Sequence, residues 1–313
     1  MTTRSANGDQ ASTAVRPILK WAGGKRQLLP VLRQYYPSRF SRYLEPFLGS
    51  GAVFLDCHNR GLLEGKRVQL SDVNADVIGC YRMVRDDVEA VIEKLAALEK
   101  GHRANGRDHF YDVRDGQFNE LRRDVHRSAE PAGAYTPALA AMLIYLNRTG
   151  YNGLFRLNSR GAFNVPLGRY ASVTICDADN VRRLAAALQR PGLTLETRSF
   201  DAALGDGQRD DFIYLDPPYA PVSRTAHFTS YTALRFGRDE QFALQRAVVR
   251  LARLGASVLL SNSVAPEIRR LYADNIDARS AGLRARKVQA RRAINSRASG
   301  RGAVHEYLIT NIV

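Results

Sequence analysis

Short apolar runs alternate with stretches of helical spacing along most of the chain. Each run is rich in branched and aromatic residues and ends at turn-forming residues, which predicts a buried strand. Apolar residues recur at helical intervals between several of these runs, most clearly over 239–254. Strands that alternate with helices predict an α/β sheet. The predicted strands lie at 43–45, 68–70, 193–198, 212–215, 257–260 and 307–312.

The stretch 75–174 interrupts this alternation. Its apolar spacing is helical up to Leu95, and further helices are expected near 110–123 and 137–148. A hairpin turn signal follows at Asn158-Ser159-Arg160-Gly161. We therefore expect an inserted unit of helices and a β-hairpin between two segments that form one domain, 15–74 and 175–313.

The 313 residues carry a formal net charge of +15, and most of the basic residues are arginines. A GC-rich genome would explain the preference for arginine over lysine but not the net charge, so a polyanionic partner is favoured. No apolar run is long enough to span a membrane, and residues 1–14 are small, polar and expected to be disordered. Three widely spaced cysteines match no disulfide framework or zinc site and indicate a reducing cytoplasm: Cys57, Cys80 and Cys176.

Asp216-Pro217-Pro218-Tyr219 follows the apolar run 212–215 directly. Two prolines cannot continue a strand ladder, so the chain leaves the sheet there as a stiff turn. Open α/β sheets bind ligands at this carboxyl edge. A carboxylate, proline-fixed carbonyls and an aromatic ring would suit a planar amine that stacks on Tyr219. The alternative is an ordinary strand end with a solvated Asp216.

Two glycine-containing segments precede predicted helices. The first is Trp21-Ala22-Gly23-Gly24-Lys25, in which the alternative is a core tryptophan and a solvated lysine. The second has Gly49-Ser50-Gly51 after the strand at 43–45, where glycine lets the backbone approach a ligand closely. Asp72 follows about 20 residues later and is placed to accept from ribose hydroxyls. The alternative is that Asp72 caps a helix, and the two roles could coexist.

Arginines without acidic neighbours characterise 147–170. They accompany Tyr151, Leu154 and Phe155 on the predicted hairpin, as expected of a surface that contacts nucleic acid, with a solvated hairpin as the alternative. The arginines are Arg148, Arg156, Arg160 and Arg169. A second basic run at 284–301 is read either as contacting phosphates or as flexible and solvated.

Four motifs in this order resemble those of the Dam-type (group alpha) DNA adenine-N6 methyltransferases: KWAGGK, EPFxGxG, YNGLxRxNxxGxFNVPxGRY and DPPY. The resemblance covers residues 17–219 by motif and is weaker to the end. It implies a Rossmann-like, seven-stranded methyltransferase sheet, 15–74 with 175–313, and a target-recognition insert of helices and a β-hairpin at 75–174. It also implies S-adenosylmethionine as cofactor and double-stranded DNA as partner, commonly at GATC.

The resemblance also implies roles for individual residues. Cofactor-binding positions are Trp21, Lys25, Glu45, Phe47, Gly49, Gly51, Asp72 and Asp216. DNA-contacting positions are Lys20, Arg148, Tyr151, Asn152, Leu154, Arg156, Pro166 and Arg169. Phe155 and Leu157 fall at variable positions of the family pattern, which leaves the target sequence open.

The expected reaction methylates N6 of adenine, a poor nucleophile because its lone pair is delocalised into the ring. Asp216 and the Pro217 carbonyl would accept its N–H groups, and Tyr219 would stack on the base. The adenine must leave the duplex, and Leu154 is a candidate wedge. No metal is needed, because the sulfonium already activates the methyl group. The alternatives are a methyltransferase of another amine (N4-cytosine, RNA or protein) and a catalytically inactive DNA-binding relative; a restriction endonuclease partner stays open.

Overall fold

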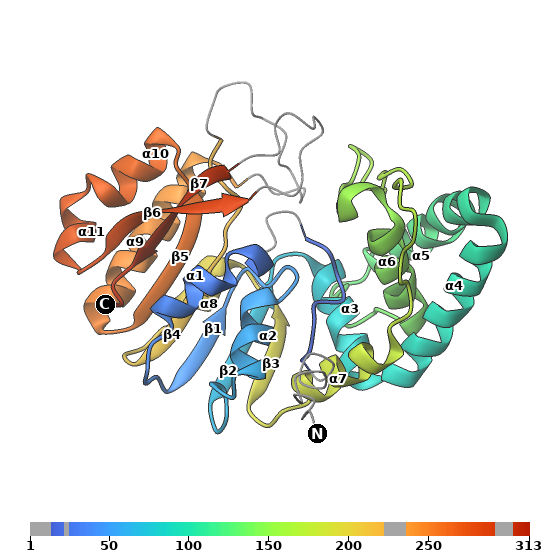
Figure 1. Cartoon of the computed structure of the whole chain (residues 1–313), viewed down its shortest axis with the longest axis horizontal. Coiled ribbons are helices and arrows are strands. Elements are labelled where there is room, and N and C mark those ends of the chain that lie inside the picture. The colour runs from blue at the N-terminus through green and yellow to red at the C-terminus, as the bar shows by residue number, and fades with distance from the viewer. Residues whose placement is uncertain (1–13, 22–24, 222–235, 292–302) are drawn as a thin grey trace, which may run out of the picture.

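The computed structural model describes residues 14–21, 25–221, 236–291 and 303–313. Its strands form one seven-stranded sheet in the order β3-β2-β1-β4-β5-β7-β6 (Figure 1). β7 is antiparallel to both neighbours, and the other neighbouring pairs are parallel. The strands are β1 Arg42–Glu45, β2 Arg67–Asp72, β3 Leu193–Thr197, β4 Asp211–Leu215, β5 Ser257–Ser263, β6 Arg284–Arg291 and β7 Ala303–Thr310. The seven-stranded sheet expected from the resemblance is confirmed.

Helices cover both faces of this sheet. The α-helices are α1 Leu29–Leu32, α2 Ala52–Asn59, α3 Ala75–Asp86, α4 Val88–Tyr111, α5 Asn119–Val125, α6 Pro137–Thr149, α7 Ala178–Leu188, α8 Phe200–Gly205, α9 Arg238–Leu254, α10 Pro266–Ile268 and α11 Ile276–Ser280. Short 3₁₀ turns occur at Lys25–Gln27, Arg33–Tyr35 and Tyr151–Gly153, and π-helical turns at Asp112–Phe118 and Arg269–Ala273. None of the helices within the described ranges is long and apolar enough to cross a membrane.

β4 is buried on both faces, which explains its continuous apolar sequence. Phe212 and Tyr214 belong to one core cluster, together with residues of α2, α3 and α7. Ile213 and Leu215 belong to the other, beneath α9. The alternation follows from the two-residue period of a strand. Two covered faces leave the ends of the strands as the accessible part of the sheet.

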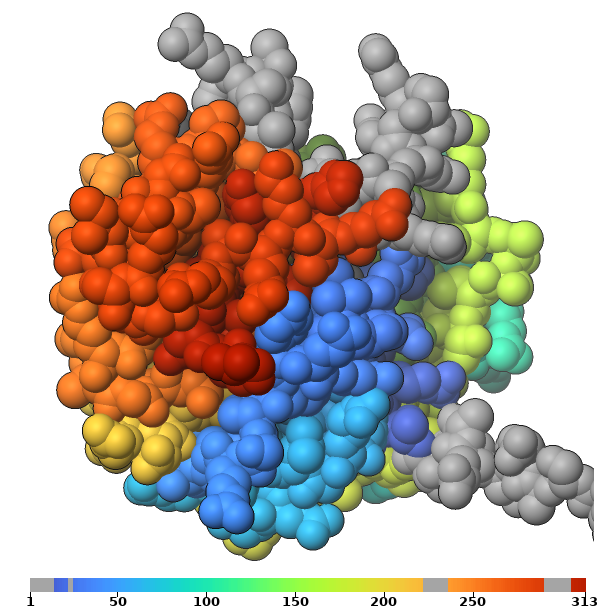
Figure 2. Space-filling view, turned by 60° about the vertical axis from the view of Figure 1, so that its left-hand side comes forward, coloured from blue at the N-terminus to red at the C-terminus, as the bar shows by residue number. Residues whose placement is uncertain are grey.

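The six predicted strands are confirmed, and β6 was missed. The first part of the basic run 284–301 is this strand, so its interpretation as a flexible segment is wrong for 284–291. An edge strand tolerates charged side chains, because one side of it faces solvent. Figure 2 shows the β6–β7 pair beside the blue segment 25–45. There the Arg286 guanidinium lies 5.7 Å from the centre of the Tyr35 ring. The rest of the run and the predicted disorder of 1–14 lie outside the described residues, apart from Ala14.

Helices α4, α5 and α6 stand to one side of the sheet, beyond α3 and α7 (Figure 1). Their buried residues share a core cluster with one face of the sheet, so the boundaries of the insert at 75–174 stay predictions. The loop that follows α6, residues 150–170, is called the 150–170 loop below. Its predicted turn is confirmed, since the Gly161 N–H donates to the Asn158 carbonyl at 2.9 Å. The loop is an irregular hairpin with two isolated bridges, Gly150–Leu167 and Leu157–Phe163.

Candidate active site

Asp216 stands at the carboxyl end of β4, where it was predicted. Its Oδ1 lies 2.8 Å from Lys25 Nζ and accepts from Ser261 Oγ at 3.1 Å. Burial raises the pKa of the Asp216 carboxyl, and the Lys25 ammonium opposes that rise. The Lys25 side chain is 4% exposed and that of Asp216 is 23% exposed. The alternatives of a solvated aspartate and a solvated lysine are therefore wrong.

The Pro217-Pro218-Tyr219 turn is held by contacts from two other elements. Gln241 of α9 donates to the Pro218 carbonyl at 3.0 Å, and Asn262 at the end of β5 donates to Gln241 at 3.2 Å. The side-chain Oδ1 of Asn262 also accepts from the Ala220 N–H at 3.3 Å. The turn is thus rigid for reasons beyond its prolines. Such support keeps a binding group in one place.

The Tyr219 ring lies 4.8 Å from Lys25 Nζ, a cation–π distance. Its hydroxyl donates to Glu306 Oε2 at 2.7 Å, from β7. Because Glu306 is negative and close, it also raises the pKa of Asp216. Sequence reasoning missed Glu306, since its position in the site depends on β7 pairing beside β5. It also missed Ser261, although Ser261 ends a predicted strand and that signal was available.

Asp72 ends β2 and closes the turn Gly49-Ser50-Gly51, which is called the glycine loop below. Its Oδ2 accepts from the Gly49 N–H at 2.9 Å, and its Oδ1 accepts from the Asn74 N–H at 2.9 Å. Burial raises the pKa of Asp72 to about 6, and these hydrogen bonds oppose the rise. The cap of α3 is Asn74, which accepts from the Asp76 N–H. The suggestion that Asp72 caps the helix is therefore wrong.

Gly49 and Gly51 adopt positive φ angles of 46° and 64°. A Cβ at Gly49 would lie 2.8 Å from the Trp21 ring, so glycine is needed for this close approach as well as for the backbone conformation. Trp21 also stacks on Phe155, with ring centres 5.8 Å apart. Trp21 is partly buried and packs against the core, so the core interpretation is confirmed in part, and cofactor binding by Trp21 stays a prediction. Gly23 and Gly24 lie outside the described residues.

Glu45 lies beneath the glycine loop and is 2% exposed. Its Oε2 accepts from the Tyr43 hydroxyl at 2.6 Å and from the Phe54 N–H at 3.0 Å. Burial raises its pKa to about 8, and the charges of Asp216 and Asp72 add to the rise. These contacts support α2 and the glycine loop, and cofactor binding by Glu45 stays a prediction.

Phe47 forms an aromatic wall with two residues that the sequence did not identify. Its ring stacks on Phe200 at 5.6 Å, from the start of α8, and meets the edge of Phe236 at 5.7 Å. Phe200 follows β3, and Phe236 precedes α9. An aromatic surface of this kind suits a flat ring.

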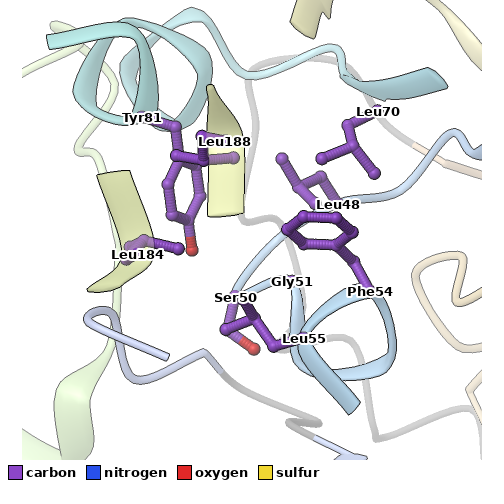
Figure 3. Close-up of a pocket in the computed structure, with 9 residues that line it drawn as sticks. All are labelled: Leu48, Ser50, Gly51, Phe54, Leu55, Leu70, Tyr81, Leu184 and Leu188. Carbon is purple, nitrogen blue, oxygen red and sulfur yellow. The ribbon is translucent and has the colours of Figure 1, made fainter. Parts of the chain in front are cut away.

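Figure 3 shows a small cavity on the inner side of the glycine loop. Its volume is about 10 Å³, which is enough for one water molecule at most. Ser50 and Tyr81 contribute hydroxyls, and the other side chains that line it are apolar. We regard it as a packing gap and not as the ligand site.

Most of the predicted DNA-contacting residues lie together on the 150–170 loop. Tyr151, Arg156, Pro166 and Arg169 are exposed, whereas Asn152 and Leu154 are half-buried. Asn152 has a positive φ of 56°. Phe155, Phe163 and Val165 point into the core and anchor the loop.

Lys20 and Arg148 make internal contacts beside this loop. Lys20 Nζ donates to the Arg148 carbonyl at 3.1 Å and lies 4.2 Å from the centre of the Tyr170 ring. The Arg148 guanidinium donates to the carbonyls of Ile18 and Thr174. These bonds make Arg148 a structural arginine, and its DNA contact stays a prediction.

Asn147, which the sequence did not identify, joins Lys20 to the 150–170 loop. It is 1% exposed, accepts from the Lys20 N–H at 2.7 Å, and donates to the carbonyls of Lys20 and Gly153. Lys20 directly precedes Trp21, and Gly153 directly precedes Leu154. The Asn147 side chain therefore fixes the backbone beside both residues.

Comparison with known proteins agrees with these motifs. Residues 21–294 match the family model described as D12 class N6 adenine-specific DNA methyltransferase. The chain is 34% identical over 301 residues to the type II methyltransferase M1.LlaDCHI of Lactococcus lactis, covering 95% of each chain. It is also 34% identical to a DNA adenine methylase of Vibrio cholerae, covering 94% of this chain and 95% of that one. An rRNA methyltransferase from Streptomyces viridochromogenes (aviRa) aligns at 15% identity, covering 97% of this chain and 94% of that one, with a TM-score of 0.36.

Proposed function

The chain belongs to the D12 class of N6 adenine-specific DNA methyltransferases, and we propose that it methylates an adenine taken out of duplex DNA, within GATC, with S-adenosylmethionine as the donor. The observation that carries the proposal is the rigid Asp216–Tyr219 turn, with Asp216 paired to buried Lys25 at the carboxyl end of β4. A fixed acceptor beside an aromatic ring is what a planar amine requires.

The residues at the strand ends fit the cofactor. S-adenosylmethionine supplies a methyl group on a positively charged sulfur, together with a ribose and a flat base. Asp72 offers a carboxylate to hydroxyl groups, and the glycine loop permits close approach because Gly49 and Gly51 lack a Cβ. Trp21 and Phe47 present aromatic surfaces, and the carboxylates of Asp72 and Asp216 suit a cation.

Asp216 and the Pro217 carbonyl would accept the two N–H groups of the adenine. Accepting both would favour a pyramidal nitrogen, whose lone pair could then attack the methyl group. The bond from that methyl to sulfur would break to leave a neutral thioether, and the nitrogen would lose one proton. Lys25 favours the ionised form of Asp216 and so maintains it as an acceptor. Tyr219 would stack on the base, and its hydroxyl bond to Glu306 fixes the ring.

The 150–170 loop supplies the proposed contacts with DNA. Its exposed Arg156 and Arg169 suit phosphates and base edges, and Leu154 is the proposed wedge. Extruding a base costs a few kcal/mol of stacking, which phosphate contacts offset in part. The match of Leu154 and Arg156 to the family pattern supports GATC, and relatives named DNA adenine methylase support adenine as the methylated base.

The test is transfer of labelled methyl from S-adenosylmethionine to a GATC duplex and to a duplex with that site scrambled. Label on adenine in the first duplex alone would support both the reaction and the site. Asp216→Ala should abolish transfer while cooperative unfolding is retained. Asp179→Ala is the control, because that side chain is 82% exposed on α7.

Other outcomes separate the alternatives. Label in both duplexes would keep the chemistry and refute GATC, and label on cytosine would indicate an N4 methyltransferase. Cofactor binding without transfer would indicate an inactive DNA-binding relative. The likeness to a type II methyltransferase supports a restriction endonuclease partner. Such a partner would cleave the unmethylated host DNA in a strain that lacks this methyltransferase.

A further inference from the structure

A buried ion pair joins the start of α3 to the turn of the 150–170 loop. The Asp76 carboxylate is 1% exposed and accepts from Arg122 Nε at 2.9 Å and from Arg122 Nη2 at 2.8 Å. The remaining nitrogen of Arg122, Nη1, donates to the Gly161 carbonyl at 2.6 Å. His126 and the Tyr135 hydroxyl also contact the Asp76 carboxylate. One guanidinium therefore holds a helix start and a loop turn together.

The helix start leads directly to the glycine loop. The Asn74 N–H donates to Asp72, and the Asp76 N–H donates to Asn74. Asp72 in turn accepts from the Gly49 N–H. An unbroken chain of hydrogen bonds therefore runs from the proposed cofactor loop to the proposed DNA-contacting loop.

Two further side chains attach the same edge of the loop. Asn119 of α5 accepts from the Phe163 N–H at 2.7 Å and donates to the Phe163 carbonyl at 3.0 Å. Arg114 donates to the Val165 carbonyl at 3.0 Å. Every second residue from Gly161 to Val165 is thus bound by a side chain. Within the described ranges this edge pairs only with the other arm of its own hairpin and with no strand of the sheet, so these side chains and the buried Phe163 and Val165 attach it to the rest of the protein.

A buried ion pair is weak evidence for stability, because desolvation offsets much of its attraction. Its geometry is more informative. Lysine could replace the charge of Arg122 but could not bond Asp76 and Gly161 together through a planar fork. All three guanidinium nitrogens are used, two on Asp76 and one on Gly161. This geometry indicates that Arg122 serves to hold Gly161 in a fixed position relative to Asp76.

We infer that Arg122 is a positioning residue that fixes the 158–161 turn relative to the glycine loop, so that DNA meets the cofactor site in one orientation. This inference rests on the proposed function in one respect, namely that the 150–170 loop contacts DNA. The positioning itself can be measured without DNA.

Arg122→Lys is the main variant, and Arg123→Lys is the control because Arg123 is its exposed neighbour on the same helix. Hydrogen exchange is measured over residues 156–165, and dissociation constants are measured for a GATC duplex and for S-adenosylmethionine. Arg122→Lys should speed exchange in that segment and weaken duplex binding about tenfold, while cofactor binding changes less than about twofold. The control should match the wild type.

Unchanged exchange and unchanged duplex affinity in Arg122→Lys would overturn the inference. Equal weakening of duplex and cofactor binding would also overturn it, because that indicates general loosening. Should Arg122→Lys fail to fold, Asn119→Ala provides the same test at Phe163, with the same decisive outcomes. If the wild-type protein binds no duplex, the proposed function is refuted. Hydrogen exchange over residues 156–165 would still show whether Arg122 fixes the 158–161 turn.

Discussion

Replacing Glu45 by glutamine should stabilise the protein at neutral pH. Burial raises the pKa of this carboxyl from an ordinary 4.5 to about 8, and the hydrogen bonds from Tyr43 and the Phe54 N–H only partly oppose the rise. The folded protein therefore holds Glu45 protonated at pH 7, whereas the unfolded chain releases the proton. Glutamine keeps a carbonyl that can accept both hydrogen bonds and has no proton to release.

The magnitude follows from linkage between proton binding and folding. Each pKa unit is worth about 1.4 kcal/mol, so the rise to about 8 costs roughly 5 kcal/mol once the pH exceeds both values. The folded pKa is the higher one, so the contribution of Glu45 to stability is greatest below the unfolded pKa of 4.5, falls as the pH rises, and levels off above about 8. At pH 7 the expected advantage of Glu45→Gln is about 3 kcal/mol.

Urea unfolding at pH 4.5, 7 and 8.5, followed by circular dichroism, measures this difference. Its growth with pH is the diagnostic result, and Glu93→Gln is the control because that side chain is 73% exposed. A variant that is less stable than wild type, or a difference that is constant with pH, would refute the protonated state of Glu45. Unchanged cofactor affinity in Glu45→Gln would indicate that Glu45 supports the glycine loop and does not bind the cofactor.

Three further outcomes are expected at the site. Cofactor affinity should fall by up to about tenfold per pH unit below the Asp72 pKa of about 6, because the ionised carboxylate accepts hydroxyl donors better. Titrations that use fluorescence of Trp21, the single tryptophan, check this, and Asp72→Asn should remove the pH dependence. Gly49→Ala should lower stability by about 1–3 kcal/mol more than Gly65→Ala, because both have positive φ but only Gly49 faces Trp21; equal losses in thermal melts would count against the close approach. Tyr219→Phe should slow single-turnover methylation by about tenfold or less, because it loses only the bond to Glu306 and keeps the ring, whereas Tyr219→Ala should lose far more.

The parts of the site that the sequence predicted are those whose chemistry is local. Asp216 follows an apolar run and precedes two prolines, so its place at a strand end depends on neighbouring residues alone. The positive φ angles of Gly49 and Gly51 follow equally from a tight turn between strand and helix. Backbone constraints of this kind act over a few residues and are therefore visible in a short motif.

The residues that sequence reasoning missed owe their place to long-range pairing. Glu306 reaches Tyr219 only because β7 is inserted antiparallel between β5 and β6. Gln241 and Asn262 support the proline turn from elements that follow it by more than 20 residues. β6 itself was hidden, because edge strands tolerate the charges that are typical of flexible segments. Helical or strand periodicity contains no information about such partners.

The connection between the two halves of the site is the clearest case. Asn147 and Arg122 are polar residues that would be read in sequence as solvated positions on helices, yet both are buried. Each bonds backbone groups of segments far away in the chain, Asn147 at Lys20 and Gly153, and Arg122 at Gly161. A buried backbone group without a partner costs about 1–3 kcal/mol. The 150–170 loop is therefore favoured in the position in which its carbonyls meet these two side chains. Motifs therefore identify the groups proposed to perform the chemistry, and buried polar side chains outside the motifs fix the position of the 150–170 loop relative to those groups.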